Sequence, residues 1–169
     1  DLHSFPTRRS SDLLSNIATA YATFASQGTR HDTHIVSTVS NSAGSVSYTP
    51  STDGEKVFSD GVMADATYAM QQVVLNGSGK TAQSLGRPVA AKTGSSSDNK
   101  SAQFAGYTPQ IATAVTLYQA GEGGEEESIT PWGKYEEVTG STYPADIFTD
   151  YMTTDRKSTR LNSSHIIES

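Results

Sequence analysis

The fold of this chain is decided by residues 87–109, which read Arg-Pro-Val-Ala-Ala-Lys-Thr-Gly-Ser-Ser-Ser-Asp-Asn-Lys-Ser-Ala-Gln-Phe-Ala-Gly-Tyr-Thr-Pro. Residues 88–93 are suited to an extended strand, residues 94–100 are small and polar, and residues 102–107 are again suited to a strand. Residues 111–118 then alternate large and small side chains, as a strand packed on one face does. The stretch therefore predicts three successive antiparallel strands joined by short turns.

Three helices are predicted around these strands. Residues 14–27 carry apolar side chains at helical spacing and stop at Gly28. A second helix follows Ser59 as its N-cap and ends at Asn76-Gly77. The last begins at Pro144. The apolar faces expected to enter the core are Val62, Met63, Ala66, Met70, Val73 and Val74 in the second helix, and Ile147, Phe148, Tyr151 and Met152 in the last.

A hairpin is predicted between the first two helices. Its strands are residues 35–39 and 45–48, and its turn is Asn-Ser-Ala-Gly at 41–44. The predicted fold class is thus α/β (α+β), with an antiparallel sheet flanked by helices.

Composition excludes several classes of protein. The chain has 12 basic and 18 acidic residues, for a formal net charge of −6, which argues against a nucleic-acid-binding surface. It has no cysteine, which excludes disulfide frameworks and thiolate metal sites. No apolar run approaches the roughly 20 residues of a membrane span, so any signal or anchor is expected upstream.

Several short motifs match known sites in the wrong context. Residues 77–81, Gly-Ser-Gly-Lys-Thr, look like the end of a P-loop, but Val74 stands where the first glycine is needed and the run follows a helix. Residues 97–100, Ser-Asp-Asn-Lys, fit two serine-enzyme patterns but lie in a turn, whereas a nucleophile and its lysine need one helix face. The pair His31 and His34 and the acidic loop at 121–127 lack fixed coordination geometry, so no metal and no cofactor are expected.

The two ends of the chain differ from the rest. Residues 1–13 and 156–169 resemble translated sequencing-adapter DNA, and we exclude them from the fold prediction as non-native tails. The alternative is that they are ordinary polar termini. The predicted domain is residues 14–155.

The order of segments resembles a known family. The segments are Ala-Tyr-Ala-Thr-Phe-Ala (20–25), Gly-Arg-Pro-Val-Ala-Ala-Lys-Thr-Gly (86–94), Phe-Ala-Gly-Tyr-Thr-Pro-Gln (104–110) and Thr-Gly-Ser-Thr-Tyr-Pro-Ala (139–145). In this order they resemble the C-terminal part of the transpeptidase domain of class A (bifunctional) penicillin-binding proteins. The resemblance implies part of a penicillin-binding transpeptidase fold, which is serine β-lactamase-like. The chain would be truncated before the Ser-x-x-Lys and Ser-x-Asn motifs.

The resemblance also implies roles for the strand that carries Lys-Thr-Gly. Lys92 and the backbone N–H of Ser95 would be catalytic, the latter as an oxyanion-hole donor. Thr93, Gly94, Ser95 and Ser96 would bind the substrate. The implied partners are peptidoglycan stem peptides and β-lactams, and the parent protein would be membrane-anchored on the extracytoplasmic face of the bacterial membrane. Without the nucleophile, this fragment alone is expected to be inactive.

The sequence departs from the family pattern at four positions. Ser95 and Ser96 stand where threonines are usual, Gln103 replaces an aromatic residue, and Ala91 stands where glycine is frequent. Two other functions stay open on the sequence alone. One is a non-catalytic domain that recognises muropeptides without acylation, and the other is ATP binding at Lys80.

Overall fold

A computed structural model describes the backbone of residues 14–164 and the side chains of residues 14–154. Its largest sheet has four antiparallel strands in the order β5-β6-β7-β8: β5 Ala90–Ser95, β6 Ser101–Tyr107, β7 Ala112–Ala120 and β8 Glu126–Glu127. The three predicted strands are confirmed. The acidic loop predicted at 121–127 is shorter than expected, because its last two glutamates pair with Gln119 and Ala120 as β8.

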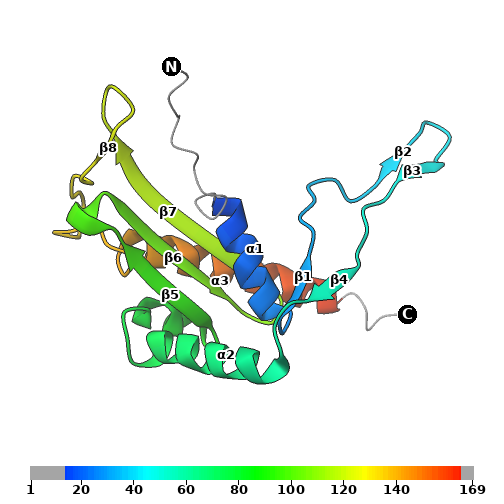
Figure 1. Cartoon of the computed structure of the whole chain (residues 1–169), viewed down its shortest axis with the longest axis horizontal. Helices are drawn as coiled ribbons and strands as arrows, with labels where there is room; N and C mark the ends of the chain where they lie inside the picture. Colours follow the sequence, from blue (N-terminus) through cyan, green and yellow to red (C-terminus); the bar gives the residue numbers. More distant parts are fainter. Residues whose placement is uncertain (1–13, 165–169) are drawn as a thin grey trace, which may run out of the picture.

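Helices cover both faces of this sheet (Figure 1). The helix α1, Leu14–Ala25, lies against β6 and β7. The helix α3, Tyr143–Ser164, packs on the same two strands from the opposite side. The helix α2, Asp60–Leu75, flanks β5 and is followed by the 3-10 helix η2, Lys80–Leu85. The predicted class, a mixed fold with an antiparallel sheet flanked by helices, is confirmed.

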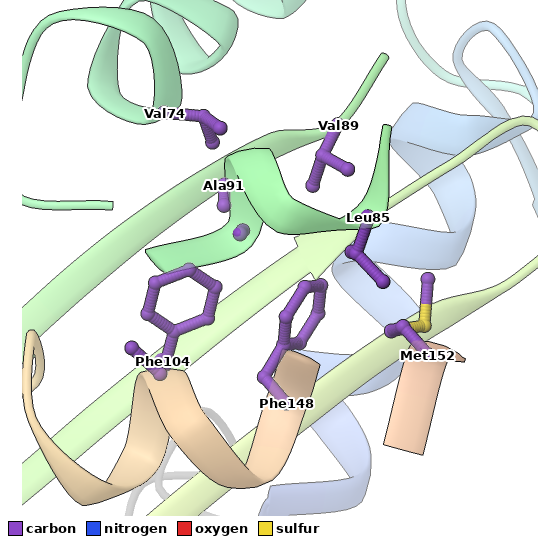
Figure 2. Packing of buried hydrophobic residues seen from close by; sticks show 9 residues of the cluster. Val74, Leu85, Val89, Ala91, Phe104, Phe148 and Met152 are labelled. Carbon is purple, nitrogen blue, oxygen red and sulfur yellow. The ribbon is translucent and has the colours of Figure 1, made fainter. Parts of the chain in front are cut away.

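The core lies between the sheet and α3 (Figure 2). Phe104 from β6 and Phe148 from α3 are both fully buried, with ring centroids 4.7 Å apart. Around them pack buried apolar side chains from α2, η2, β5, the residue before β5, and α3: Val74, Ala82, Leu85, Val89, Ala91, Ala145 and Met152. This cluster fixes β5 between α2 and β6.

The helix ends follow from local chemistry. The Ser59 hydroxyl accepts a hydrogen bond from the Val62 N–H at 3.4 Å and so caps α2, as predicted. Gly28, the predicted stop of the first helix, adopts a φ of +86°. That left-handed conformation favours glycine, and it lets the Gly28 N–H donate to the Thr23 carbonyl oxygen.

Three of the residues predicted for the core are exposed instead. Val62 lies in the first turn of α2, where no element covers it among the described residues, and it is 55% exposed. On α3, Phe148 and Met152 are buried as predicted, but Ile147 and Tyr151 are exposed. The apolar stripe on α3 is wider in the sequence than the part of the helix that meets the sheet.

The predicted hairpin is confirmed in place but is smaller. Its strands are β2, Val39–Ser40, and β3, Val46–Tyr48, which pair antiparallel. Residues 35–38 are not in a strand, because residue pairing ends at Val39. The sequence analysis missed a second short pair, β1, Thr29–His31, with β4, Gly54–Lys56, at the base of this hairpin.

The predicted tails are described only in part. Residues 1–13 and 165–169 lie outside the described residues. The backbone of α3 continues through the predicted boundary at residue 155 to Ser164. The domain limits therefore remain a prediction.

Candidate functional site

The strand β5 runs from the core to the surface. Ala90 and Ala91 are buried, whereas Lys92 and Ser95 are exposed. In the described part of the chain, β5 pairs with β6 on one side only, so it is an edge strand. The first residues of β5 anchor the strand in the core. The Lys-Thr-Gly sequence that follows them therefore lies at the open edge of the sheet.

Lys92 projects from one face of β5 and Thr93 from the other. Thr93 lies opposite Phe104 in the sheet register, so its side chain is on the face that α3 covers. Lys92 lies opposite Ala105 on the other face, and its Nζ donates to the carbonyl oxygen of Thr93 at 2.7 Å. The ammonium is therefore held along the strand.

Thr93 and Ser95 share one face, and each hydroxyl contacts a group from another segment. The Thr93 Oγ1 lies 2.6 Å from the Oγ of Ser78, in the loop after α2. The Ser95 Oγ accepts a hydrogen bond from the backbone N–H of Gly140 at 3.1 Å. Sequence reasoning missed both contacts. The glycine run around Ser78 was weighed only as a phosphate-binding motif, which its position between α2 and η2 does not fit.

The protein's own packing does not explain the glycine at position 94. A Cβ built on Gly94 would meet the Cβ of Gln103 at 3.6 Å and its Oε1 at 3.9 Å, which are ordinary contacts. Gly140 differs, because its Cβ would collide with the carbonyl oxygens of Gln103 and Gly94. The loop at 139–142 therefore approaches the β5–β6 backbone as closely as glycine permits.

The remaining serines form the turn after β5. The Ser96 hydroxyl accepts from the Ser101 N–H at 2.7 Å, so its oxygen closes the turn. Residues 97–99 form the short 3-10 segment η3, in which Asp98 and Asn99 have φ values of 58° and 51°. The placement of Ser97-Asp-Asn-Lys in a turn is confirmed, and no helix face joins Ser97 to Lys100.

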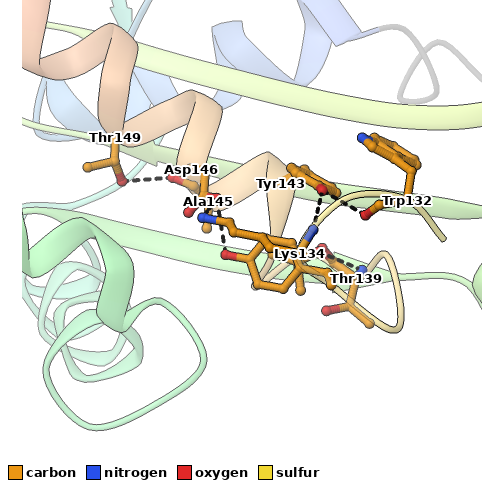
Figure 3. A network of polar contacts seen from close by, with 9 residues as sticks. Trp132, Lys134, Thr139, Tyr143, Ala145, Asp146 and Thr149 are labelled. Carbon is orange, nitrogen blue, oxygen red and sulfur yellow. Dashed lines mark hydrogen bonds and ion pairs between the residues drawn. The ribbon is translucent and has the colours of Figure 1, made fainter.

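A polar and aromatic network holds the loop that carries Gly140 (Figure 3). Tyr143 donates its hydroxyl to the Trp132 carbonyl at 2.7 Å, and the two rings stack with centroids 4.6 Å apart. Asp146, at the start of α3, pairs with the Lys134 Nζ at 2.7 Å and accepts from the Tyr135 hydroxyl at 3.1 Å. The hydrogen bond from Lys134 to Asp146 raises the pKa of the lysine. The loop is thus fastened to α3 beside the end of β5.

Metal-binding clusters and membrane spans are not found in the part of the chain that the structure describes. No group of three or more His, Asp or Glu side chains there could hold a metal ion. His31 lies in β1, with its Nδ1 3.1 Å from the Thr52 carbonyl oxygen, and His34 lies in the following loop. None of the described helices combines the length and apolar character needed to cross a bilayer.

The fold and the site define a mixed α/β domain that displays Lys-Thr-Gly on the edge of an antiparallel sheet. Residues 14–135 match the family model described as the penicillin binding protein transpeptidase domain. The chain belongs to this family, and the resemblance inferred from the order of its motifs is confirmed.

Relatives and solved structures agree. Over 79% of its length the chain is 36% identical to penicillin-binding protein 1A of Mycolicibacterium smegmatis, covering 17% of that protein. Over 81% of its length it is 32% identical to penicillin-binding protein 1F of Bacillus subtilis, covering 19%. It also superposes on the PonA1 protein from Mycobacterium tuberculosis in complex with penicillin V, with a TM-score of 0.65 and 30% identity over 84% of this chain and 37% of that one. The chain thus spans less than a fifth of these two curated relatives.

Proposed function

We propose that this chain is part of a peptidoglycan D,D-transpeptidase that cross-links cell-wall stem peptides through a serine acyl-enzyme. The observation that carries the proposal is the edge strand β5, with its Lys-Thr-Gly, in a chain that belongs to the transpeptidase family. The PonA1 structure named above contains penicillin V, and penicillins are analogues of the acylating peptide. The nucleophile is supplied by residues outside this chain.

The roles of the strand residues follow from their chemistry. Lys92 is a fixed cation that attracts the ligand's carboxylate and supports proton transfer. Thr93 and Ser95 present hydroxyls from one face of β5 and bind that carboxylate. Gly94 leaves room for the ligand beside the backbone. The protein's own packing does not require glycine there, because a Cβ would make only ordinary contacts. Ser96 shapes the end of the binding strand through its turn.

The backbone N–H of Ser95 is proposed as one of two oxyanion-hole donors. The second belongs to the nucleophile, as in other serine acyl-transferases. Removing one such donor typically costs about 3–4 kcal/mol of transition-state stabilisation. The chain studied alone therefore holds one wall of the cleft and is expected to be inactive. In the parent protein the site would face the extracytoplasmic side of a membrane to which the protein is anchored.

The test begins with the genomic locus, sequenced outward from codons 14 and 155. A frame that continues upstream through Ser-x-x-Lys and Ser-x-Asn is expected, and the full-length protein is then expected to be labelled covalently by a fluorescent penicillin. Lys92→Ala and Thr93→Ala should each slow this labelling by about tenfold or more. The isolated chain should stay unlabelled.

The second candidate function is a domain that recognises muropeptides without acylation. It is favoured by the departure at Ser95 and Ser96, which keep the hydroxyls but lose the β-branched stiffness of threonine. It predicts a continuous upstream frame that lacks the serine, and binding of stem peptides that is reversible. An upstream frame without the serine, together with stem-peptide binding that never becomes covalent, would replace the enzyme with the binding domain.

A further inference from the structure

Ser78 lies between two glycines that fold the chain against the end of α2. The N–H groups of Gly77 and Gly79 both donate to the Val73 carbonyl oxygen, at 3.1 and 2.9 Å. A Cβ at either position would meet that same oxygen at 3.0 or 3.2 Å, tighter than most real contacts. Both positions therefore favour glycine, and the side chain between them is the one directed at β5.

The end of α2 is also tied down from η2. The side-chain amide of Gln83 donates to the carbonyl oxygens of Val74 and Leu75, at 2.7 and 2.9 Å. These bonds satisfy carbonyls that a helix end otherwise leaves without partners. The loop that carries Ser78 is thus braced by the end of α2 and by η2, and the position of the Ser78 hydroxyl is fixed before any ligand arrives.

The contact between Ser78 and Thr93 bears on which way the Thr93 proton points. Each hydroxyl has one proton to donate and can accept as well. At 2.6 Å the two oxygens share one hydrogen bond, so one of the two protons remains free for another acceptor. If Ser78 donates, the free proton is on Thr93, and it can be given to a carboxylate.

Ser95 provides the parallel case two residues along the same face. Its oxygen accepts from the Gly140 N–H, which can only donate, so the Ser95 proton is free to be donated outward. If each of the Thr93 and Ser95 hydroxyls accepts a hydrogen bond from a neighbouring segment, both keep their own protons to donate to one anion. This match between the two sites favours Ser78 as donor to Thr93.

We propose that Ser78 is a positioning residue that holds the Thr93 hydroxyl as a hydrogen-bond donor to the carboxylate of the bound peptide or β-lactam. The proposal rests on the function proposed for Thr93 above. It gives a role to the glycine run at 77–81 that is unrelated to nucleotide binding. A purely structural role would require only that the loop and β5 stay together.

The test uses the full-length protein from the genomic locus, with Ser78→Ala, Ser78→Thr and the control Ser84→Ala. Ser84 is exposed, and its hydroxyl donates to the Thr81 carbonyl oxygen within η2, away from β5. Penicillin acylation is separated into the dissociation constant of the initial complex and the rate constant of acylation. Ser78→Ala removes the neutral hydrogen bond that orients the Thr93 proton, so it should weaken the initial complex by about three- to tenfold and leave the acylation rate constant unchanged. Ser78→Thr should restore binding, and Ser84→Ala should match the wild type.

The methyl ester of the same penicillin separates positioning from structure, because it lacks the anionic carboxylate. Wild type and Ser78→Ala should bind the ester equally. Equal weakening for acid and ester, or no weakening for the acid, would overturn the role of Ser78 while labelling of the wild type upholds the transpeptidase. A wild-type protein that no penicillin labels or binds would overturn the proposed function and, with it, the ligand assigned here to Ser78.

Discussion

The sheet core and the hairpin arm, residues 32–53, contain similar side chains but differ in burial. Val74, Val89 and Phe104 are at most 4% exposed in the core. In the arm, Ile35 is 99% exposed and Val46 is 61% exposed. Figure 1 shows the arm projecting away from the sheet, with no helix over either face. Comparing the two regions therefore separates two effects: the preference of β-branched residues for extended backbone, and the stability gained by burying their side chains.

The arm keeps its shape through local hydrogen bonds. The Asn41 side-chain oxygen accepts from the N–H groups of Ala43 and Ser45, at 3.0 and 2.9 Å, and the Asn41 N–H donates to the Ser45 carbonyl. Gly44 in the same turn has a φ of +80°. Turn chemistry and β propensity form a hairpin, whereas the core needs partners that are distant in sequence. Mutations in the two regions should differ accordingly.

The largest effect is expected for Phe148→Ala in the core. Phe148 is fully buried against Phe104, so truncation removes apolar contact and leaves a cavity, at a cost of about 3–5 kcal/mol in the free energy of unfolding. Urea unfolding measures it. The matched control is Tyr151→Ala on the same helix, which is 55% exposed and should change the value by about 0.5 kcal/mol or less. Equal losses for the two variants would contradict the packing of α3 described here.

A smaller effect is expected for Gly140→Ala, where a loop meets the sheet. The new Cβ would collide with the carbonyl oxygen of Gln103 and lie 2.6 Å from that of Gly94, so the loop must shift at a cost of about 1–3 kcal/mol. Thermal unfolding checks it, with Gly61→Ala as control. Gly61 lies within α2 with nothing within 4 Å of its Cβ, so alanine should stabilise the protein there. A Gly140→Ala protein as stable as Gly61→Ala would show that the loop does not press on β5.

The ion pair between Lys134 and Asp146 should make a pH-dependent contribution that is smaller again. The partner raises the pKa of Lys134 in the folded state, so the stabilisation is fully present below the unfolded lysine value of about 10.4 and is lost as pH rises through the folded value. The difference in Tm between wild type and Lys134→Met should therefore be present at neutral pH and disappear in strong alkali. Lys80→Met, at an exposed lysine with no ion pair among the described residues, is the control and should show no such trend. A constant difference at every pH would mean that Lys134 acts through packing.

Much of the fold could be predicted because its signals are local. The N-cap at Ser59, the stop at Gly28 and the alternation along β7 each act within a few residues, and all three were predicted. Exposure could not be predicted in the same way. Val62 and Ile147 have the spacing of core residues but lie beyond the area that the sheet and its helices cover. A periodic pattern predicts which face of a helix a side chain is on. Only the arrangement of the helices and strands determines whether another element covers that face.

The candidate site divides in the same manner. The strand with Lys92 and Thr93 could be located from the sequence, because its motif is contiguous. Its partners could not, because Ser78 is 15 positions from Thr93 and Gly140 is 45 positions from Ser95. Ser78 lies between two glycines, and Gly140 lies between Thr139 and Ser141. Both compositions predict a loop, and the sequence of a loop does not say which strand the loop contacts.

The smallest effect is expected in the arm. Ile35→Ser and Val46→Ser each replace a side chain that is largely exposed, so each should change the free energy of unfolding by about 0.5 kcal/mol or less. Urea unfolding at several protein concentrations checks this. A loss as large as that of Phe148→Ala, or one that grows with concentration, would show that the arm is buried against another molecule in solution. The core and the arm would then differ only in the step that buries their side chains. The core side chains are buried on folding, and those of the arm would be buried on association.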